Sequence, residues 1–206
     1  MSQIIKSCDI WVVACKHRPA VVLAHMGTVN HNVHWTDDYE LPEGWKVNPQ
    51  YGSWVNNHTG HLRCFRGHQD ALKKSTADCT LILEDDAIPN NPEWTSIVAH
   101  SMTFLDKYEV ISMHGRAWHP DAFNISEMRG PAVKIAEPKV QRSGSVWVQG
   151  SLAYLIRKDA KQRLIEKEYD GFPIDIFLCN MFDFALIHPS PFDHGSGHVV
   201  KSLIDG

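Results

Sequence analysis

Short apolar runs alternate along the chain with stretches in which apolar residues recur at helical spacing. The short runs predict strands that are buried on both faces, and the spaced pattern predicts helices packed against a sheet. Strands are expected at residues 9–14, 29–35, 80–83, 108–113, 145–149, 151–157 and 184–188, and helices at 20–26, 59–75, 92–106 and 159–168. Because the two alternate at spacings that suit crossover connections, we predict an α/β fold with a mostly parallel central sheet flanked by helices.

Two long stretches, residues 39–57 and 114–137, show no sustained period and contain several Pro and Gly residues. Loops of this length in a compact domain often carry function. The aromatic residues of the first stretch could stack on a sugar or a base, or they could cover the core. They are Tyr39, Trp45, Tyr51 and Trp54.

The apolar run at residues 81–83 leads directly into three adjacent acids, Glu84, Asp85 and Asp86. A buried carboxylate without a partner is costly, so acids at the tip of a core strand need a cation. Ligands of open α/β sheets bind outside the carboxyl ends of the strands, and carboxylates together with phosphate oxygens suit Mg²⁺ or Mn²⁺. The pattern therefore predicts a metal site that holds a diphosphate. The alternative is a solvated acidic turn.

Charged residues also follow the first two predicted strands. Arg18 lies between the first strand and a helix start, where it could bind a phosphate or nucleotide group or could be an exposed loop residue. Asp38 follows the second strand, where it could contact a ribose or a base or could belong to a turn.

Three potential zinc ligands, His61, Cys64 and His68, fall on one face of the predicted helix at 59–75. They would need a fourth ligand from elsewhere or an open coordination position. The alternative is that they are ordinary core residues of a half-buried helix.

Length and composition fit one domain spanning residues 1–206, with 43% hydrophobic residues. The formal net charge of -4 gives no global basic field that would attract nucleic acid or an anionic membrane. Five widely spaced cysteines without a CxxC pair suit reduced thiols, and no run of eighteen apolar residues occurs. We therefore expect a cytoplasmic protein without a membrane span.

Several separate motifs resemble, in the same order, those of family 25 glycosyltransferases, the group of lipooligosaccharide and collagen galactosyltransferases. The helix residues Gly60, Cys64, Gly67 and His68, followed by the acidic strand at 83–87, are similar to that family's Gly-x-x-x-Cys-x-x-Ser-His and Leu-Glu-Asp-Asp-Ala motifs. Residues 153–156 and 173–175 resemble its later Ala-Tyr-Leu-Ile and Pro-Val-Asp segments. The chain departs from the family at Gly67, where the family has serine, and in having only Arg18 after the first strand.

The resemblance implies a Rossmann-like glycosyltransferase A fold and a single domain that transfers a sugar from a UDP-sugar to a hydroxyl acceptor. It implies Mn²⁺, or Mg²⁺, bound by Asp86, with Glu84 touching the metal through water or contacting the ribose. Asp85 and His68 would belong to the cofactor-binding set. Related enzymes add a histidine from the chain's end, and His194 is our choice, with His188 and His198 as rivals.

An inverting outcome, also implied by the family, needs a base that takes the proton of the attacking acceptor hydroxyl. Asp175 is the candidate for this base, and its alternative role is to cap the following helix.

A saccharide or glycan precursor is the expected acceptor, and three other functions remain open. The first is a bacteriophage-type DNA-base glycosyltransferase, for which the basic residues of the helix at 59–75, with Lys134, Lys139 and Arg142, could form a local basic strip. The second is a metal-dependent hydrolase of a nucleotide or sugar phosphate. The third is a sugar- or nucleotide-binding module without activity. The sequence contains no GxSxG or Walker A motif, which disfavours serine hydrolases and P-loop enzymes.

Overall fold

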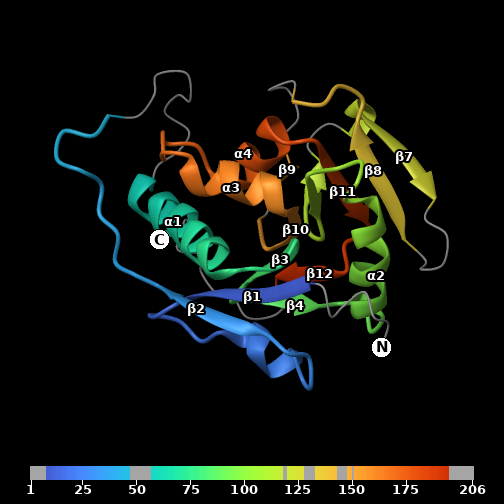
Figure 1. Cartoon of the computed structure of the whole chain (residues 1–206), viewed down its shortest axis with the longest axis horizontal. Coiled ribbons are helices and arrows are strands. Elements are labelled where there is room, and N and C mark those ends of the chain that lie inside the picture. The colour runs from blue at the N-terminus through green and yellow to red at the C-terminus, as the bar shows by residue number, and fades with distance from the viewer. Residues whose placement is uncertain are drawn as a thin grey trace.

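An eight-stranded sheet forms the centre of the molecule (Figure 1). The structure is a computed structural model that describes residues 8–46, 57–117, 120–127, 133–142, 148–149 and 151–194. In spatial order the strands are β2 (Asn32–Thr36), β1 (Cys8–Cys15), β3 (Cys79–Glu84), β10 (Ala153–Arg157), β5 (Val110–Ser112), β11 (Phe184–His188), β8 (Lys134–Pro138) and β7 (Phe123–Glu127).

Six of the eight strands point in one direction, while β10 and β8 are reversed. Strand β10 lies between β3 and β5 and is antiparallel to both, and β8 is antiparallel to β11 and β7. The prediction of an α/β fold with a mostly parallel sheet is therefore confirmed for strand direction. The two reversed strands were not predicted.

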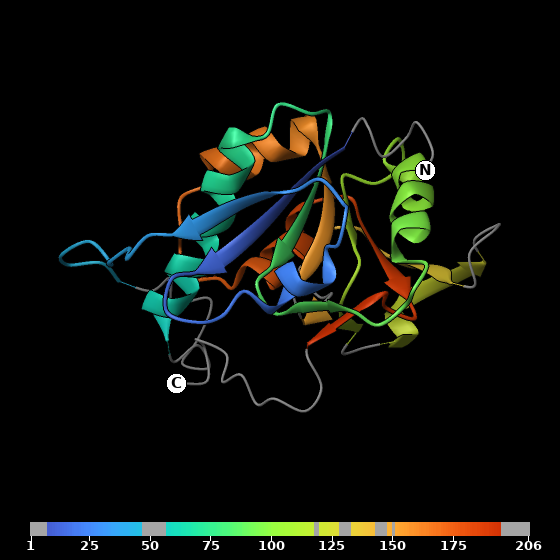
Figure 2. The same ribbon diagram turned by 90° about the horizontal axis from the view of Figure 1, so that it is seen from below.

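Helices cover both faces of the sheet (Figures 1 and 2). Helices α1 (His58–Lys74), α3 (Lys158–Glu166) and α4 (Ile174–Met181) pack on one face, and α2 (Trp94–Ser101) packs on the other. Side chains of β3 alternate between the two layers: Leu81 and Leu83 face the α2 layer, and Ile82 faces α1. Glu84 continues the alternation on the α1 face.

Two small two-stranded sheets complete the fold. Strand β4 (Ala87–Pro89) pairs with β12 (Phe192–His194), and β6 (Arg116–Ala117) pairs with β9 (Val148–Gln149). Short 3-10 helices lie at Val21–His25, Met102–Phe104 and Pro120–Ala122. Among the described residues, no helix has the length and apolar character needed to cross a bilayer.

The predicted loop at 114–137 is the main error in the expected elements, because it contains β6, β7 and most of β8. Strand β7 is an edge strand, and its Ile125 is 56% exposed, so its apolar pattern is weak. Strand β8 lies between β11 and β7, and its Ile135 and Ala136 are buried in opposite layers, but this short apolar pair is not a sustained pattern. Elsewhere, the helix expected at 92–106 ends as α2 at Ser101 before a 3-10 turn, and α3 begins at Lys158, so Asp159 lies in its first turn rather than at its cap.

Candidate functional site

Three segments that are distant in sequence meet at the carboxyl edge of the sheet. Parallel pairing of β1 with β3 brings the ends of both strands to this edge, the first followed by Arg18 and the second by Asp85 and Asp86. Pairing of β12 with β4 places His194 opposite Ala87, directly after the acids. The site therefore depends on a contact that spans more than half of the chain.

Arg18 and Asp85 form a buried ion pair. The guanidinium donates through Nε (2.8 Å) and Nη2 to the two Asp85 oxygens, and the backbone N–H of Cys15 donates to Oδ2 at 2.8 Å. Burial lowers the pKa of Arg18, but the hydrogen bond and charge of Asp85 outweigh this and raise it above its ordinary value. Arg18 and Asp85 are therefore partners of each other in this structure, and the contact of either side chain with a cofactor stays a prediction.

Asp86 is buried but incompletely paired. Its Oδ1 has no hydrogen-bond partner among the described residues, although the side chain is only 11% exposed. Its Oδ2 lies 3.6 Å from Arg18 Nη1 and 3.5 Å from His194 Nδ1. An unsatisfied buried carboxylate oxygen beside an imidazole is a donor set that suits a divalent cation such as Mn²⁺ or Mg²⁺.

His194 is the histidine that the fold brings to Asp86. Contact with Asp86 raises the pKa of His194, against the opposing effect of burial. Of its rivals, His188 is exposed at the end of β11 and pairs in register with Lys134, away from Asp86, and His198 lies outside the described residues. The choice of His194 fits this geometry.

His114 also belongs to this site and was missed in the sequence. It follows β5, and its ring packs edge-on against that of His194 with centroids 5.1 Å apart. Its Nδ1 lies 2.9 Å from the carbonyl oxygen of Phe192, so this nitrogen carries the proton. Burial lowers the pKa of His114, which favours the neutral ring. Glu84 was identified in the sequence as a polar residue directly after an apolar run. His114 follows the apolar run of β5 in the same way.

Glu84 points to the α1 face, away from the Arg18–Asp85 pair. Its Oε1 accepts a hydrogen bond from Ser151 Oγ at 2.5 Å and lies 3.4 Å from His68 Nε2. Burial would raise the pKa of Glu84, but the contacts with His68 and Ser151 and the charge of Arg18 outweigh it and lower the pKa. Glu84 is therefore held ionised by neighbours that the sequence did not reveal.

His68 lies behind Glu84. Its ring is fully buried, with Nδ1 2.9 Å from the hydroxyl of Tyr154. His68 therefore contacts Glu84 and Tyr154, and its predicted contact with the cofactor stays a prediction.

The zinc hypothesis also changes, because Cys64 and His68 share their cluster with Glu84 and not with His61. His61 is buried, and burial lowers its pKa to about 4.

Asp175 lies in the first turn of α4, whose N-cap is Pro173. Its Oδ1 accepts from the backbone N–H of Ile176 at 2.8 Å, so the carboxylate satisfies a first-turn donor without being the N-cap residue. Its charge also acts on the Cys64 thiol, which places Asp175 near the Glu84 side of the site. Asp38 remains more distant and exposed, with Oδ1 3.3 Å from His17 Nε2.

Two of the loop aromatics cover the core rather than offering a sugar platform. Trp45 stacks on Tyr169 with centroids 5.7 Å apart and lies beside His58, and Tyr39 donates a hydrogen bond to Asp70. Tyr51 and Trp54 lie outside the described residues.

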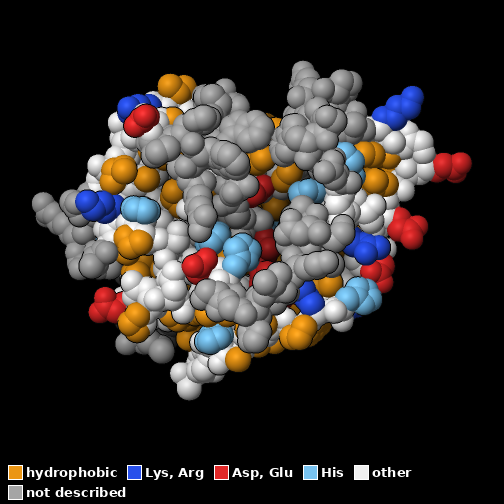
Figure 3. Space-filling model, turned by 180° about the vertical axis from the view of Figure 1, so that it is seen from behind, with side chains coloured by type: hydrophobic (Ala, Val, Ile, Leu, Met, Phe, Trp, Pro, Cys, Tyr) orange, Lys and Arg blue, Asp and Glu red, His pale blue; other side chains and the backbone are white. Residues whose placement is uncertain are grey.

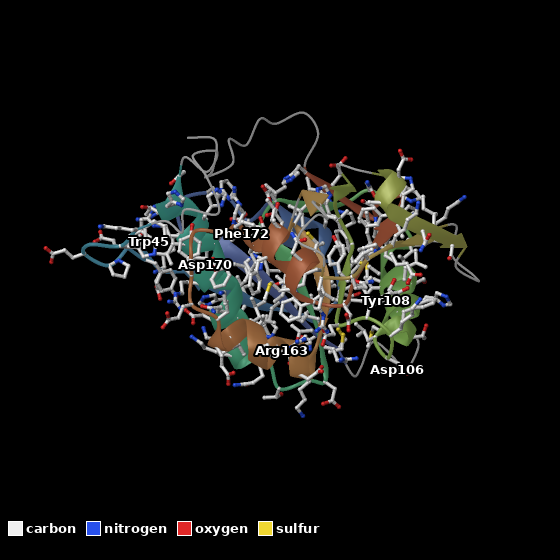
Figure 4. The ribbon with its side chains drawn as sticks, turned by 90° about the horizontal axis from the view of Figure 1, so that it is seen from above. Trp45, Asp106, Tyr108, Arg163, Asp170 and Phe172 are labelled. Carbon is white, nitrogen blue, oxygen red and sulfur yellow. The ribbon has the colours of Figure 1, made fainter. Side chains whose placement is uncertain are left out.

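Figures 3 and 4 show the molecule from two further sides. On the face seen in Figure 3, acidic and histidine side chains gather near the middle of the surface. Figure 4 shows Trp45 and Asp170 toward one end of the molecule and Asp106 and Tyr108 toward the other.

Comparisons with known proteins identify no family. No family model matches the chain, and no curated protein matches it. Among solved structures, A197 from STIV covers 89% of this chain, with 83% of its own length matched, 10% identity and a TM-score of 0.43. CMP:2-keto-3-deoxy-manno-octonic acid synthetase complexed with CTP covers 80% of this chain and 80% of its own, at 14% identity and a TM-score of 0.40. HddC from Yersinia pseudotuberculosis covers 87% and 68%, at 11% identity and a TM-score of 0.37. These likenesses are too distant to carry an argument about this chain.

Proposed function

We propose that the chain is a metal-dependent glycosyltransferase that moves a sugar from a UDP-sugar to a hydroxyl acceptor. The observation that carries the proposal is the unpartnered buried oxygen of Asp86, which lies beside His194 at the carboxyl edge of the sheet. A turn that merely met solvent would have its carboxylate exposed. The resemblance of the acidic strand and of the α1 motif to family 25 glycosyltransferases supports the same proposal.

Asp86 and His194 would hold Mn²⁺, or Mg²⁺, and Glu84 would reach the metal through water or contact the ribose. When bound, the cation neutralises charge on the departing diphosphate. The Arg18–Asp85 pair positions Asp86, because it fixes the turn after β1 against the end of β3. In this role Arg18 acts on the site through its partner rather than through a phosphate.

Asp175 would take the proton of the acceptor hydroxyl as that hydroxyl attacks the anomeric carbon. One of its oxygens accepts the Ile176 N–H, which orients the carboxylate. An inverting transfer, which the family resemblance implies, would need this carboxylate on the side of the sugar opposite the leaving group.

The acceptor we favour is a saccharide or glycan precursor rather than DNA. Three of the basic residues that could have formed a DNA-binding strip are paired with acids, among them Arg63, 3.8 Å from Asp38, and Lys73, 2.8 Å from Asp70. Arg142 contacts both Glu109 and Asp183. Paired cations release few counterions from a phosphate backbone, so they contribute little to duplex binding.

Calorimetric titration of UDP, GDP and CMP, with and without Mn²⁺, tests the proposal. We expect UDP to bind only with Mn²⁺ and Asp86→Asn to lose this binding, because the amide cannot supply a charged ligand. Asp193→Asn is the matched control, since it makes the same charge change one residue from His194 on an exposed side chain, and it should bind as the wild type. Absence of nucleotide binding under all conditions would contradict the proposal.

A further inference from the structure

A second set of metal-ligating side chains lies on the α1 face of β3. Cys64 Sγ, His68 Nε2 and Glu84 Oε1 all lie within 4.8 Å of one another. Cys64 and His68 are one helical turn apart on α1, and Glu84 is the last residue of β3, so two rigid elements hold the cluster.

The separations approach those of a tetrahedral zinc site. Ligand bonds of about 2.0–2.3 Å imply nitrogen-to-oxygen and sulfur-to-oxygen separations of about 3.3 Å and 3.5 Å. The corresponding separations are 3.4 Å between His68 Nε2 and Glu84 Oε1 and 3.9 Å between Cys64 Sγ and Glu84 Oε1. The third separation, between Cys64 Sγ and His68 Nε2, is within 4.8 Å, so a bound ion would need to draw the sulfur inward.

The outer contacts also resemble those around metal ligands. Ser151 donates to Glu84 Oε1, and the Tyr154 hydroxyl lies 2.9 Å from His68 Nδ1, the nitrogen that faces away from the cluster. Among the described residues His68 Nε2 is buried, faces Glu84 and has no hydrogen-bond partner. Ligating imidazoles are typically held, as His68 is by Tyr154, through their second nitrogen. Ser151 donates to the same Glu84 oxygen that faces the cluster.

Charge balance and ligand type favour one class of cation. A thiolate and a carboxylate together neutralise a divalent ion, which makes its burial beside a neutral imidazole favourable. Sulfur and imidazole ligands select zinc over Mg²⁺ or Mn²⁺, which prefer oxygen. The cluster thus differs in chemistry from the Asp86–His194 pair.

We propose that Cys64, His68 and Glu84 form a Zn²⁺ site that is distinct from the Asp86–His194 pair and shares Glu84 with the proposed transferase site. Three protein ligands leave a fourth coordination position for water or another oxygen donor. The ion fixes Glu84 against α1, so the same carboxylate links the zinc site to the sheet edge.

Cobalt titration of the chelator-treated full chain tests the proposal. Co²⁺ replaces zinc in such sites, and a thiolate ligand produces a sulfur-to-cobalt charge-transfer absorption. We expect this band to saturate at one equivalent of Co²⁺ and to disappear when Zn²⁺ is added. Cys64→Ser should lack the band, whereas the control Cys8→Ser, which removes a thiol at the opposite end of the strands, should keep it.

Two further variants make the test independent of whether Cys64→Ser folds. Glu84→Gln should retain the band but weaken Co²⁺ affinity by at least about tenfold, since it removes a charged ligand. Asp86→Asn should leave both band and affinity unchanged. Absence of the band in the wild type, its survival in a folded Cys64→Ser variant, unchanged affinity in Glu84→Gln, or its loss in Asp86→Asn would each overturn the proposal.

Discussion

Arg18 pairs with Asp85 in the structure, whereas the sequence suggested a phosphate or nucleotide contact for Arg18. With side chains only 16% and 1% exposed, the two groups interact where water cannot replace either partner. Removing one partner of a buried pair leaves an uncompensated charge. We expect Arg18→Ala to lower the free energy of unfolding by about 3–5 kcal/mol, measured by urea denaturation.

The control for this prediction removes the stranded charge. Asp85→Asn in the Arg18→Ala background should recover part of the lost stability. Arg18→Lys should be less stable than the wild type, because lysine cannot form the two-point contact. A loss below about 1 kcal/mol in Arg18→Ala would place the pair among weak surface bridges and contradict its structural role.

His61 gives a prediction for pH dependence. Burial lowers its pKa from 6.5 to about 4 in the folded state, so the unfolded chain binds the proton more readily between these values. The contribution of the neutral His61 ring to the free energy of unfolding is complete above pH 6.5 and is lost as the pH falls towards 4. The free energy of unfolding should therefore fall between pH 7.5 and 5.5, about 1 unit either side of the ordinary histidine pKa.

The variant His61→Gln isolates this contribution, since glutamine keeps a polar side chain that does not titrate. We expect its stability to depend less on pH than that of the wild type over the same interval. Identical pH profiles for the two proteins would show that other groups, such as His34 and His114, whose pKa values burial also lowers, carry the effect.

At the scale of whole elements, Gly67 explains both a packing contact and a departure from the family motif. A Cβ at this position would lie 2.5 Å from Thr36 Cγ2 and 3.1 Å from Val13 Cγ1. The absence of a side chain lets α1 lie directly on β1 and β2, where the serine of family 25 would not fit. The glycine at position 67 thus makes room for the methyl group of Thr36. Cys64 and His68 remain on the same face of the helix.

Gly67→Ala should therefore destabilise the protein although alanine favours helices. The gain in helix propensity is about 1 kcal/mol and the overpacking cost is about 1–3 kcal/mol, so we expect a net loss of up to about 2 kcal/mol by urea denaturation. Thr36→Ser removes the methyl group that clashes, and the double variant should be more stable than Gly67→Ala alone. A stabilised single variant would mean that α1 shifts to make room.

The elements that the sequence predicted well are those with strong local patterns. Strand β11 begins and ends where the apolar run does, and β1 and α1 differ from expectation by one residue at each end. The edge strand β7 and its neighbour β8 lacked such a pattern, and strand direction depends on connections that no local period encodes. This is why β10 was expected as a strand but not as a reversed one.

The site was predictable to the extent that strand ends reveal it. The three acids were predicted as a site because they follow a buried apolar run. Only the fold shows that Asp85 pairs with Arg18, while Asp86 Oδ1 has no hydrogen-bond partner among the described residues. The contacts of His114 and Ser151 depend on pairings between distant strands. Long-range contacts of this kind leave no periodic signal in the sequence.

At the scale of the whole molecule, Phe192 anchors the segment that carries His194. Its side chain is fully buried and packs edge-on against Trp94 of α2, with centroids 5.4 Å apart. We expect Phe192→Ala to cost about 3–5 kcal/mol, by urea denaturation, and to weaken Mn²⁺ binding at temperatures where the variant remains folded. The second effect follows because β12 would no longer hold His194 beside Asp86.

Phe192→Leu is the matched control, because it keeps an apolar anchor and should lose less stability and little metal affinity. If Phe192→Ala binds Mn²⁺ as tightly as the wild type, His194 is not a ligand or is held by other contacts.

The position of β10 has a consequence for how the chain is made. Strands β3 and β5 are synthesised long before the strand that separates them, which begins at Ala153. At about 5–20 residues per second, ribosomes leave β3 without this neighbour for several seconds. During that interval the nascent chain exposes two apolar strand edges that can pair with other chains. We therefore expect production of this protein to respond to chaperone supply and to slower translation, even where the finished fold is stable.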